Sequence, residues 1–151
     1  MKMFLWRALK NILPTEENLF KRRVLEDAIC MFCNQEVEST RHVLWDCPAG
    51  HGCLGGGGCD RKFHKAQFQG ADFRDVWEAL VQRCTGEELA FSTILARNIW
   101  HRRNFAIHGG GFSHPAVLVQ EAKSALKLKM QVSHHDEERV EMGVEPLLAR
   151  W

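Results

Sequence analysis

Three cysteines and one histidine gather in a short stretch of the sequence. The stretch reads C-M-F-C-N-Q-E-V-E-S-T-R-H-V-L-W-D-C and contains Cys30, Cys33, His42 and Cys47. Two cysteines separated by two residues form a tight turn from which both sulfurs can reach one ion, and the later pair can complete a tetrahedron. Four protein ligands leave no open position for a substrate. The spacing therefore predicts a structural Cys3His site that holds one Zn2+ ion.

Whether Cys47 can reach the same ion as His42 depends on where the short helix that contains His42 ends. Ser39 or Thr40 can cap a short helix that includes His42. On a continuous α-helix, His42 and Cys47 would lie about 140° apart around the axis, which aims them poorly at one ion. Pro48 disfavours helical geometry at the residue before it, so we expect Cys47 to leave the helix and turn back.

Other uses of these cysteines stay open at this point. Cys30 and Cys33 could form a redox pair, although no strand followed by a helix surrounds them. Disulfides would suit a secreted protein, but we find neither a signal peptide nor a secreted composition. The ligands could also be a metal-free relic. A structural zinc site is the interpretation we favour.

Two helices are predicted before the cysteine-rich stretch. Residues 4–11 place apolar side chains on one side of a helix, and Leu13-Pro14 stops it. Thr15 is a suitable cap for the second helix. Together with the metal ligands, these helices form a predicted zinc-knuckle-like unit over residues 1–48.

Residues 49–71 are predicted to form a flexible, glycine-rich loop. The run Gly55–Gly58 favours a loop over packed structure, and it lacks the Gly-Lys-Ser/Thr ending of a phosphate-binding loop. A second metal ion in this loop is the less favoured alternative, because the candidate ligands are irregularly spaced. Those candidates are His51, Cys53, Cys59 and His64.

Three helices are predicted in the C-terminal half, over residues 72–130. Apolar residues recur at helical intervals after a cap at Asp72, over residues 87–108 as the longest helix, and after Pro115. Residues 131–151 have little periodicity and an excess of acidic side chains, which predicts a disordered acidic tail. The predicted fold class is mainly α.

Composition narrows the range of functions. The chain of 151 residues has 45% hydrophobic residues and a net charge of +1, which gives no strong electrostatic signal for nucleic acid or membrane. No apolar run reaches a membrane-spanning length. We find no converging carboxylates and no activated nucleophile, so we expect no enzyme. Cysteines without an export signal favour an intracellular compartment, either nucleus or cytoplasm.

Two groups of basic residues are candidates for contacts to nucleic acid. The first group precedes and enters the metal-binding stretch, and the second lies in the helix predicted over residues 87–108. Each group also has a simpler explanation, as a solvated helix face or as a complement to the helix dipole. The candidates are Lys21, Arg22, Arg23 and Arg41 in the first group, and Arg97, Arg102 and Arg103 in the second.

Several short motifs around the metal ligands are shared with a known family. They are Trp6-Arg7-Ala8-Leu9, Leu13-Pro14-Thr15, Asn18-Leu19, Arg22-Arg23, Glu38-Ser39-Thr40, Cys47-Pro48-Ala49, Ile99-Trp100-His101-Arg102-Arg103-Asn104 and Val119-Gln120-Glu121-Ala122. The sequence resembles the zinc-binding region of plant non-long-terminal-repeat (LINE-type) reverse transcriptases. The resemblance covers about residues 3 to 130. It does not include the polymerase or ribonuclease H domains of that family.

The resemblance implies a non-catalytic zinc-binding module derived from a retrotransposon. Such a module would contact RNA or DNA beside a polymerase, weakly and with a strong dependence on salt. Its expected partners are nucleic acid and a neighbouring reverse transcriptase or ribonuclease H domain, and no membrane. The alternatives are a structural or protein-interaction fragment, and a decayed remnant of an element without a selected function.

Overall fold

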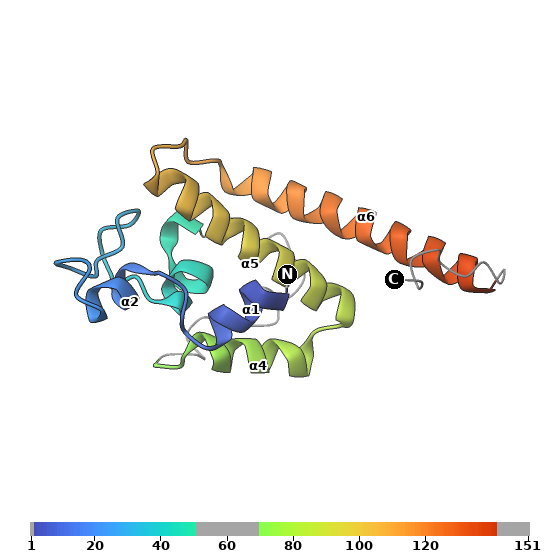
Figure 1. The fold of residues 1–151 in the computed structure, drawn as a ribbon, viewed down its shortest axis with the longest axis horizontal. Helices are drawn as coiled ribbons and strands as arrows, with labels where there is room; N and C mark the ends of the chain where they lie inside the picture. Colours follow the sequence, from blue (N-terminus) through green and yellow to red (C-terminus); the bar gives the residue numbers. More distant parts are fainter. Residues whose placement is uncertain (1, 51–69, 142–151) are drawn as a thin grey trace, which may run out of the picture.

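The protein is mainly α-helical, as predicted. The computed structural model describes residues 2–50 and 70–141, so the glycine-rich segment with its four candidate second-site ligands lies outside the described residues. Within the described residues, 2–50 and 70–141, β pairing is limited to one antiparallel bridge that joins Ile29 to Val37. The helical elements, drawn in Figure 1, are α1 (Lys2–Leu9), α2 (Glu16–Lys21), a π-helical turn η1 (His42–Asp46), a 3-10 turn η2 (Pro48–Gly50), α4 (Phe73–Arg83), α5 (Gly86–Ile107) and α6 (Pro115–Glu141).

Capping residues define where the helices of the C-terminal half begin. Asp72 caps α4 in a reciprocal arrangement with Asp75. Thr85 accepts a hydrogen bond from the backbone N–H of Glu88, while the Glu88 carboxylate accepts one from the N–H of Thr85. Thr85 therefore begins α5 with a capping box.

Helix α6 extends beyond the boundary predicted from the sequence. His114 caps it, because its ring Nδ1 accepts the N–H of Ala116, and Pro115 occupies the first helical position. The helix runs to Glu141, past the boundary predicted at residue 131, and α6 with 27 residues is longer than α5 with 22. No glycine or proline interrupts residues 116–141, so nothing in the backbone stops the helix there. None of the helices described here is both long and apolar enough to cross a bilayer.

A single hydrophobic core joins the metal-binding region to the C-terminal helices. Helix α5 lies at its centre, with α6 along one side and α1, α4 and η1 on the other (Figure 1). The core combines residues from both ends of the chain; among them are Ala8, Leu13, Val43, Leu44, Trp45, Val76, Leu95, Ile99, Trp100, Leu118 and Ala122. The region around the metal ligands is therefore held by burial of apolar surface as well as by its ligands.

A buried hydrogen-bond network connects α1 to α2. The Asn18 amide donates to the carbonyls of Asn11 and Leu13, at 2.9 Å each. The Thr15 hydroxyl accepts the Asn18 backbone N–H, and the Thr40 hydroxyl donates to the Asn11 side chain at 2.7 Å. Several residues of the shared motifs thus have structural roles, since they satisfy the buried polar groups of this connection.

Candidate metal centre

The first two ligands lie on a tight, hydrogen-bonded turn. The Cys30 N–H donates to the carbonyl of Glu36, and the Asn34 N–H donates to the carbonyl of Cys30, at 2.9 and 2.8 Å. Asn34 has a φ of 51°, in the left-handed region that asparagine tolerates better than most residues. This geometry folds the C-x2-C segment back on itself, so that both thiols face the same side.

The second two ligands are brought together by a π-helical turn. The Ser39 hydroxyl accepts the His42 N–H at 3.0 Å, which begins the turn at one of the two predicted caps. The Cys47 N–H then donates to the carbonyl of His42 at 2.7 Å, across five residues instead of the four of an α-helix. Cys47 leaves the helix with φ −56° and ψ 123°, as expected for a residue before Pro48.

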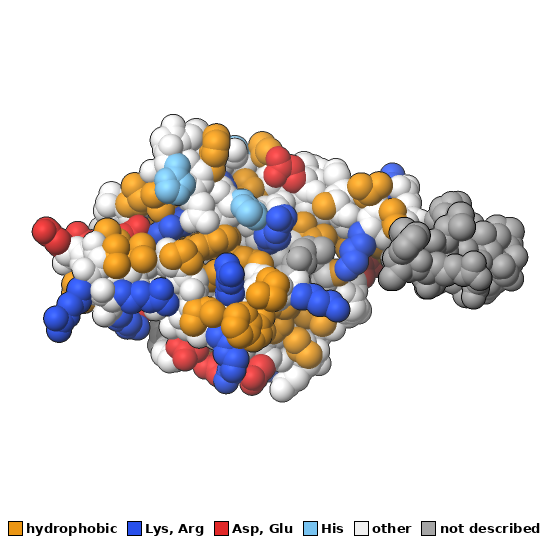
Figure 2. All heavy atoms as spheres, in the orientation of Figure 1, with side chains coloured by type: hydrophobic (Ala, Val, Ile, Leu, Met, Phe, Trp, Pro, Cys, Tyr) orange, Lys and Arg blue, Asp and Glu red, His pale blue; other side chains and the backbone are white. Residues whose placement is uncertain are grey.

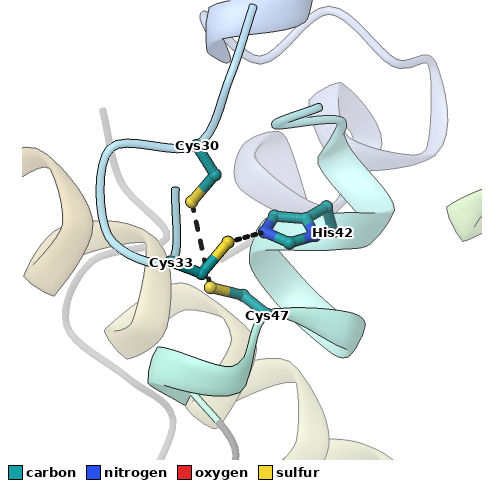
Figure 3. Close-up of side chains that lie close together, drawn as sticks. All are labelled: Cys30, Cys33, His42 and Cys47. Carbon is teal, nitrogen blue, oxygen red and sulfur yellow. Dashed lines mark hydrogen bonds between the residues drawn. The ribbon is translucent and has the colours of Figure 1, made fainter. Parts of the chain in front are cut away.

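Together these turns gather the four predicted ligands at one point. Figure 3 shows the three sulfurs and the imidazole edge converging from two separate segments. All four ligand atoms lie within 4.8 Å of one another. The Sγ atoms of Cys30 and Cys47 are 3.9 Å apart, and the Cys33 Sγ is 3.4 Å from Nε2 of His42. Cys33 is partly exposed, whereas the other three residues are buried.

These distances suit tetrahedral zinc. With Zn–S bonds of about 2.3 Å and Zn–N bonds of about 2.0 Å, the edges of the tetrahedron are about 3.8 Å between sulfurs and about 3.5 Å between sulfur and nitrogen. The measured separations of 3.9 and 3.4 Å fall close to both values. The cluster is therefore suited to one zinc ion, whose four coordination positions would all be filled by protein ligands.

The protons of the metal-free cluster are shared unevenly between its members. The hydrogen bond with Cys47, followed by burial, raises the pKa of Cys30 to about 12, and the same hydrogen bond lowers the pKa of Cys47. Burial acts to lower the pKa of His42, but hydrogen bonds and charges from Cys30 and Cys33 outweigh it and raise the pKa to about 9. Zinc competes with these protons, because it binds thiolates and neutral imidazole.

A carboxylate lies behind the histidine ligand. Oε2 of Glu36 is 3.3 Å from Nδ1 of His42, on the ring nitrogen that points away from the sulfurs. The pair lacks hydrogen-bond geometry and the Glu36 side chain is largely exposed, so the carboxylate acts on the ring through its charge, which favours a proton on Nδ1 and leaves Nε2 for the metal. The spacing of the ligands gave no sign of this role for Glu36.

The first group of predicted nucleic-acid contacts lies mostly at the surface. Arg22 and Arg23 are exposed at the end of α2, and Lys21 pairs with Glu17 at 2.7 Å while remaining largely exposed. Arg97, from the second group, is exposed on α5.

Arg41, the remaining member of the first group, is engaged within the protein. It pairs with Asp46 at 2.7 Å and donates to the carbonyl of Ala71. It is therefore less available to phosphate than Arg22 and Arg23.

Arg102 and Arg103 lie inside the protein, which corrects their prediction as surface contacts. They are only 7% and 6% exposed. Arg102 donates to the carbonyls of Ala49 and Ser113, and its guanidinium lies 4.1 Å from the centre of the Phe112 ring. Helical periodicity could not separate these arginines from exposed ones, because their partners are distant in sequence.

Glu38 is the structural residue that sequence reasoning missed. It is fully buried and binds the guanidinium of Arg103, which also pairs with Glu16. Its carboxylate accepts the N–H of Glu16, and its carbonyl accepts the N–H of Glu17, so it also caps α2. From the sequence alone, a single glutamate between metal ligands is expected to face solvent. Its partners Glu16 and Arg103 are distant in sequence, so only the fold shows the contacts.

Comparisons with known proteins agree with the metal site. Residues 1–52 match the protein family described as zinc-binding in reverse transcriptase. A putative ribonuclease H protein of Arabidopsis thaliana is 33% identical to this chain over 100 residues, which are 66% of this chain and 16% of the relative. The chain thus spans a small part of the length of that relative. No solved structure matches the chain.

Proposed function

We propose that this chain is a non-catalytic, zinc-stabilised module of a LINE-type retrotransposon reverse transcriptase, and that it contacts nucleic acid. The supporting observation is a closed Cys3His cluster in the segment that matches a zinc-binding family of reverse transcriptases. The zinc would hold together the two turns that carry its ligands, next to the core that positions α1 and α2. In this role the ion supports the fold and does no chemistry.

A closed coordination sphere argues for a structural ion. Catalytic zinc keeps one position for water or substrate, whereas four protein ligands occupy all positions here. The ligands are also mostly buried, and the apolar side chains of η1 pack into the core beside them. This arrangement favours a binding or scaffolding role over hydrolysis.

Exposed basic residues support contact with a phosphate backbone. On the face shown in Figure 2, Lys and Arg side chains occupy the middle of the surface among hydrophobic ones, whereas most Asp and Glu side chains lie near its edges. Arg22 and Arg23 add two adjacent cations at the end of α2. With a net charge of +1, we expect weak binding that depends strongly on salt.

Fluorescence anisotropy tests this proposal on the zinc-loaded chain. We expect a labelled RNA oligonucleotide to bind in low salt, and the double variant Arg22→Gln/Arg23→Gln to bind more weakly at every salt concentration. The matched control is Lys127→Gln/Lys129→Gln, which removes two exposed cations from α6. Absence of binding in low salt, or equal losses in both variants, would contradict the proposed contact.

A second candidate function is docking to a neighbouring reverse transcriptase or ribonuclease H domain. The observation that favours it is a set of exposed apolar residues on α6: Leu128 is 62% exposed, Met130 41% and Val132 54%. Light scattering of the chain mixed with such a domain tests this candidate. A complex lost in Leu128→Ser would support it, and two separate species would contradict it.

A further inference from the structure

Helix α1 carries a large aromatic side chain that the core does not use. Trp6 is 49% exposed, whereas Ala8 on the same helix is 1% exposed and belongs to the core. Tryptophan is highly buried on average, so half of an indole in contact with water needs an explanation. Trp6 also belongs to the Trp6-Arg7-Ala8-Leu9 motif, of which Ala8 and Leu9 pack against the core.

The exposed indole is flanked by cations. Lys2 lies four residues before Trp6 in α1, a spacing that brings side chains together on one face of a helix. Lys10 follows the last residue of α1, and its N–H donates to the carbonyl of Trp6 at 3.0 Å. Arg7 is also exposed, and residues 2–10 contain no aspartate or glutamate. In Figure 2, hydrophobic side chains surrounded by Lys and Arg cover the region where Figure 1 draws α1.

A flat aromatic face beside cations has a specific chemistry. A base stacks on the ring while its phosphates meet the ammonium and guanidinium groups, and this combination is typical of proteins that bind single strands. In a duplex the base faces are covered by their neighbours, so the ring would find nothing to stack on. A site for an apolar protein surface would not need two cations beside the indole.

A hollow extends this surface toward α2. It has a volume of about 620 Å³, and Lys10 and Lys21 both line it. Four carboxylates also line the hollow, and they balance its four cations: Glu17, Glu36, Asp46 and Asp72 against Lys10, Lys21, Arg41 and Arg74. The hollow is therefore neutral as a whole, so attraction for phosphate comes from the cations beside the indole and from the exposed arginines at the end of α2.

We infer that Trp6, with Lys2 and Lys10 beside it, is a stacking platform for single-stranded nucleic acid. This inference rests on the proposed nucleic-acid contact and specifies the form of the ligand. The platform selects unpaired bases, and the basic end of α2 supplies attraction that does not distinguish single strands from duplexes.

The test compares a single-stranded RNA with a duplex of the same length on the zinc-loaded chain. Trp6→Leu keeps an apolar side chain but removes the ring, and we expect it to weaken single-strand binding about 5- to 100-fold. Duplex binding should stay within about twofold, because the duplex offers no base to the ring. Trp6→Phe should lose less single-strand affinity than Trp6→Leu. Lys10→Gln should reduce the slope of log affinity against log salt concentration by about one.

The controls separate this inference from the proposed function. Phe105→Leu removes a more exposed aromatic side chain, 61% exposed on α5, and should leave both affinities unchanged. If Trp6→Leu binds the single strand normally while Arg22→Gln/Arg23→Gln does not, the platform is wrong and the proposed contact stands. If the wild-type chain binds neither RNA, both fail.

Two further results would overturn the platform. Binding to anionic lipid vesicles that Trp6→Leu abolishes would assign the indole to a membrane surface. Self-association that Trp6→Leu abolishes would assign it to a protein contact. Circular dichroism and zinc content, both unchanged in Trp6→Leu, would show that any loss of binding arises at the surface.

Discussion

The guanidinium of Arg103 binds the carboxylate of Glu38, which lies 65 positions earlier in the chain. Glu38 stands between two metal ligands, and Arg103 stands near the end of α5. Both side chains are buried, so the ion pair joins the metal-binding turns to the central helix of the core. Since a buried charge without its partner is costly, this pair couples the two parts of the fold.

Removing one member of this pair should destabilise the whole protein. We expect Arg103→Met to lower the free energy of unfolding by about 3–5 kcal/mol, because it leaves the Glu38 carboxylate buried without a cation. The double variant Arg103→Met/Glu38→Gln should recover part of this loss. Urea unfolding followed by circular dichroism measures both effects. A loss below about 1 kcal/mol in Arg103→Met would show that the pair contributes little.

Glu16 should make stability depend on pH in a defined direction. Burial, and then the charge of Glu38, raise the pKa of Glu16 above its ordinary value of 4.5, although Arg103 opposes the shift. Folding therefore shifts Glu16 toward its protonated form relative to the unfolded chain. Its contribution to stability is complete below pH 4.5 and is lost as the pH rises through the higher folded-state pKa. Glu16→Gln should lack this loss, so the wild type should become less stable relative to the variant over that range, as measured by unfolding at several pH values. Glu26→Gln is the exposed control.

Arg23 should be a residue at which stability and binding change in opposite directions. It has a φ of 60° at the end of α2, where its N–H donates to Phe20 and the N–H of Val24 donates to Leu19. Glycine is preferred at this position of such a helix ending. Arg23→Gly should therefore stabilise the protein by about 0.5–1 kcal/mol and weaken binding to RNA. Arg22→Gly, at φ −87°, should weaken binding without stabilising. Thermal melts and anisotropy together decide the outcome.

The connection between α1 and α2 should fail when its amide donor is removed. Asn18→Asp keeps the shape of the side chain but cannot donate to the carbonyls of Asn11 and Leu13, which would face a carboxylate instead. We expect a loss of about 2–4 kcal/mol, measured by urea unfolding. Asn34→Asp, with its side chain at the surface, is the matched control and should have little effect. Equal stability of the two variants would contradict the role of the network.

Loss of one ligand should remove the metal. Cys33→Ser and Cys47→Ser should each abolish stoichiometric zinc, measured by elemental analysis of the purified protein, and loosen residues 15–48, measured by hydrogen exchange. Cys84→Ser should keep its zinc, because Cys84 is partly buried against the core and is not a member of the cluster. Zinc retained at full stoichiometry in Cys47→Ser would show that another residue provides the fourth ligand.

Local patterns were sufficient for the features that local forces decide. The C-x2-C turn and the His–Cys pair identified the four residues that the fold brings together, because ligand chemistry restricts both residue type and spacing. The caps at Thr15 and Asp72 and the proline at the start of α6 were also readable, since each satisfies backbone groups within a few residues. The end of α6 was not, because residues 131–141 lack the apolar periodicity on which the helix prediction depended.

The sequence by itself determined which four residues can hold one ion, and that the fold class is mainly α. Only the tertiary structure decided that Arg102 and Arg103 are buried while Trp6 and Arg23 are exposed. Helical periodicity places a residue on a face, but whether that face meets water depends on which distant segment packs against it. For Arg103 that segment carries Glu38, and the attraction between two buried charges acts through space without leaving a pattern along the chain.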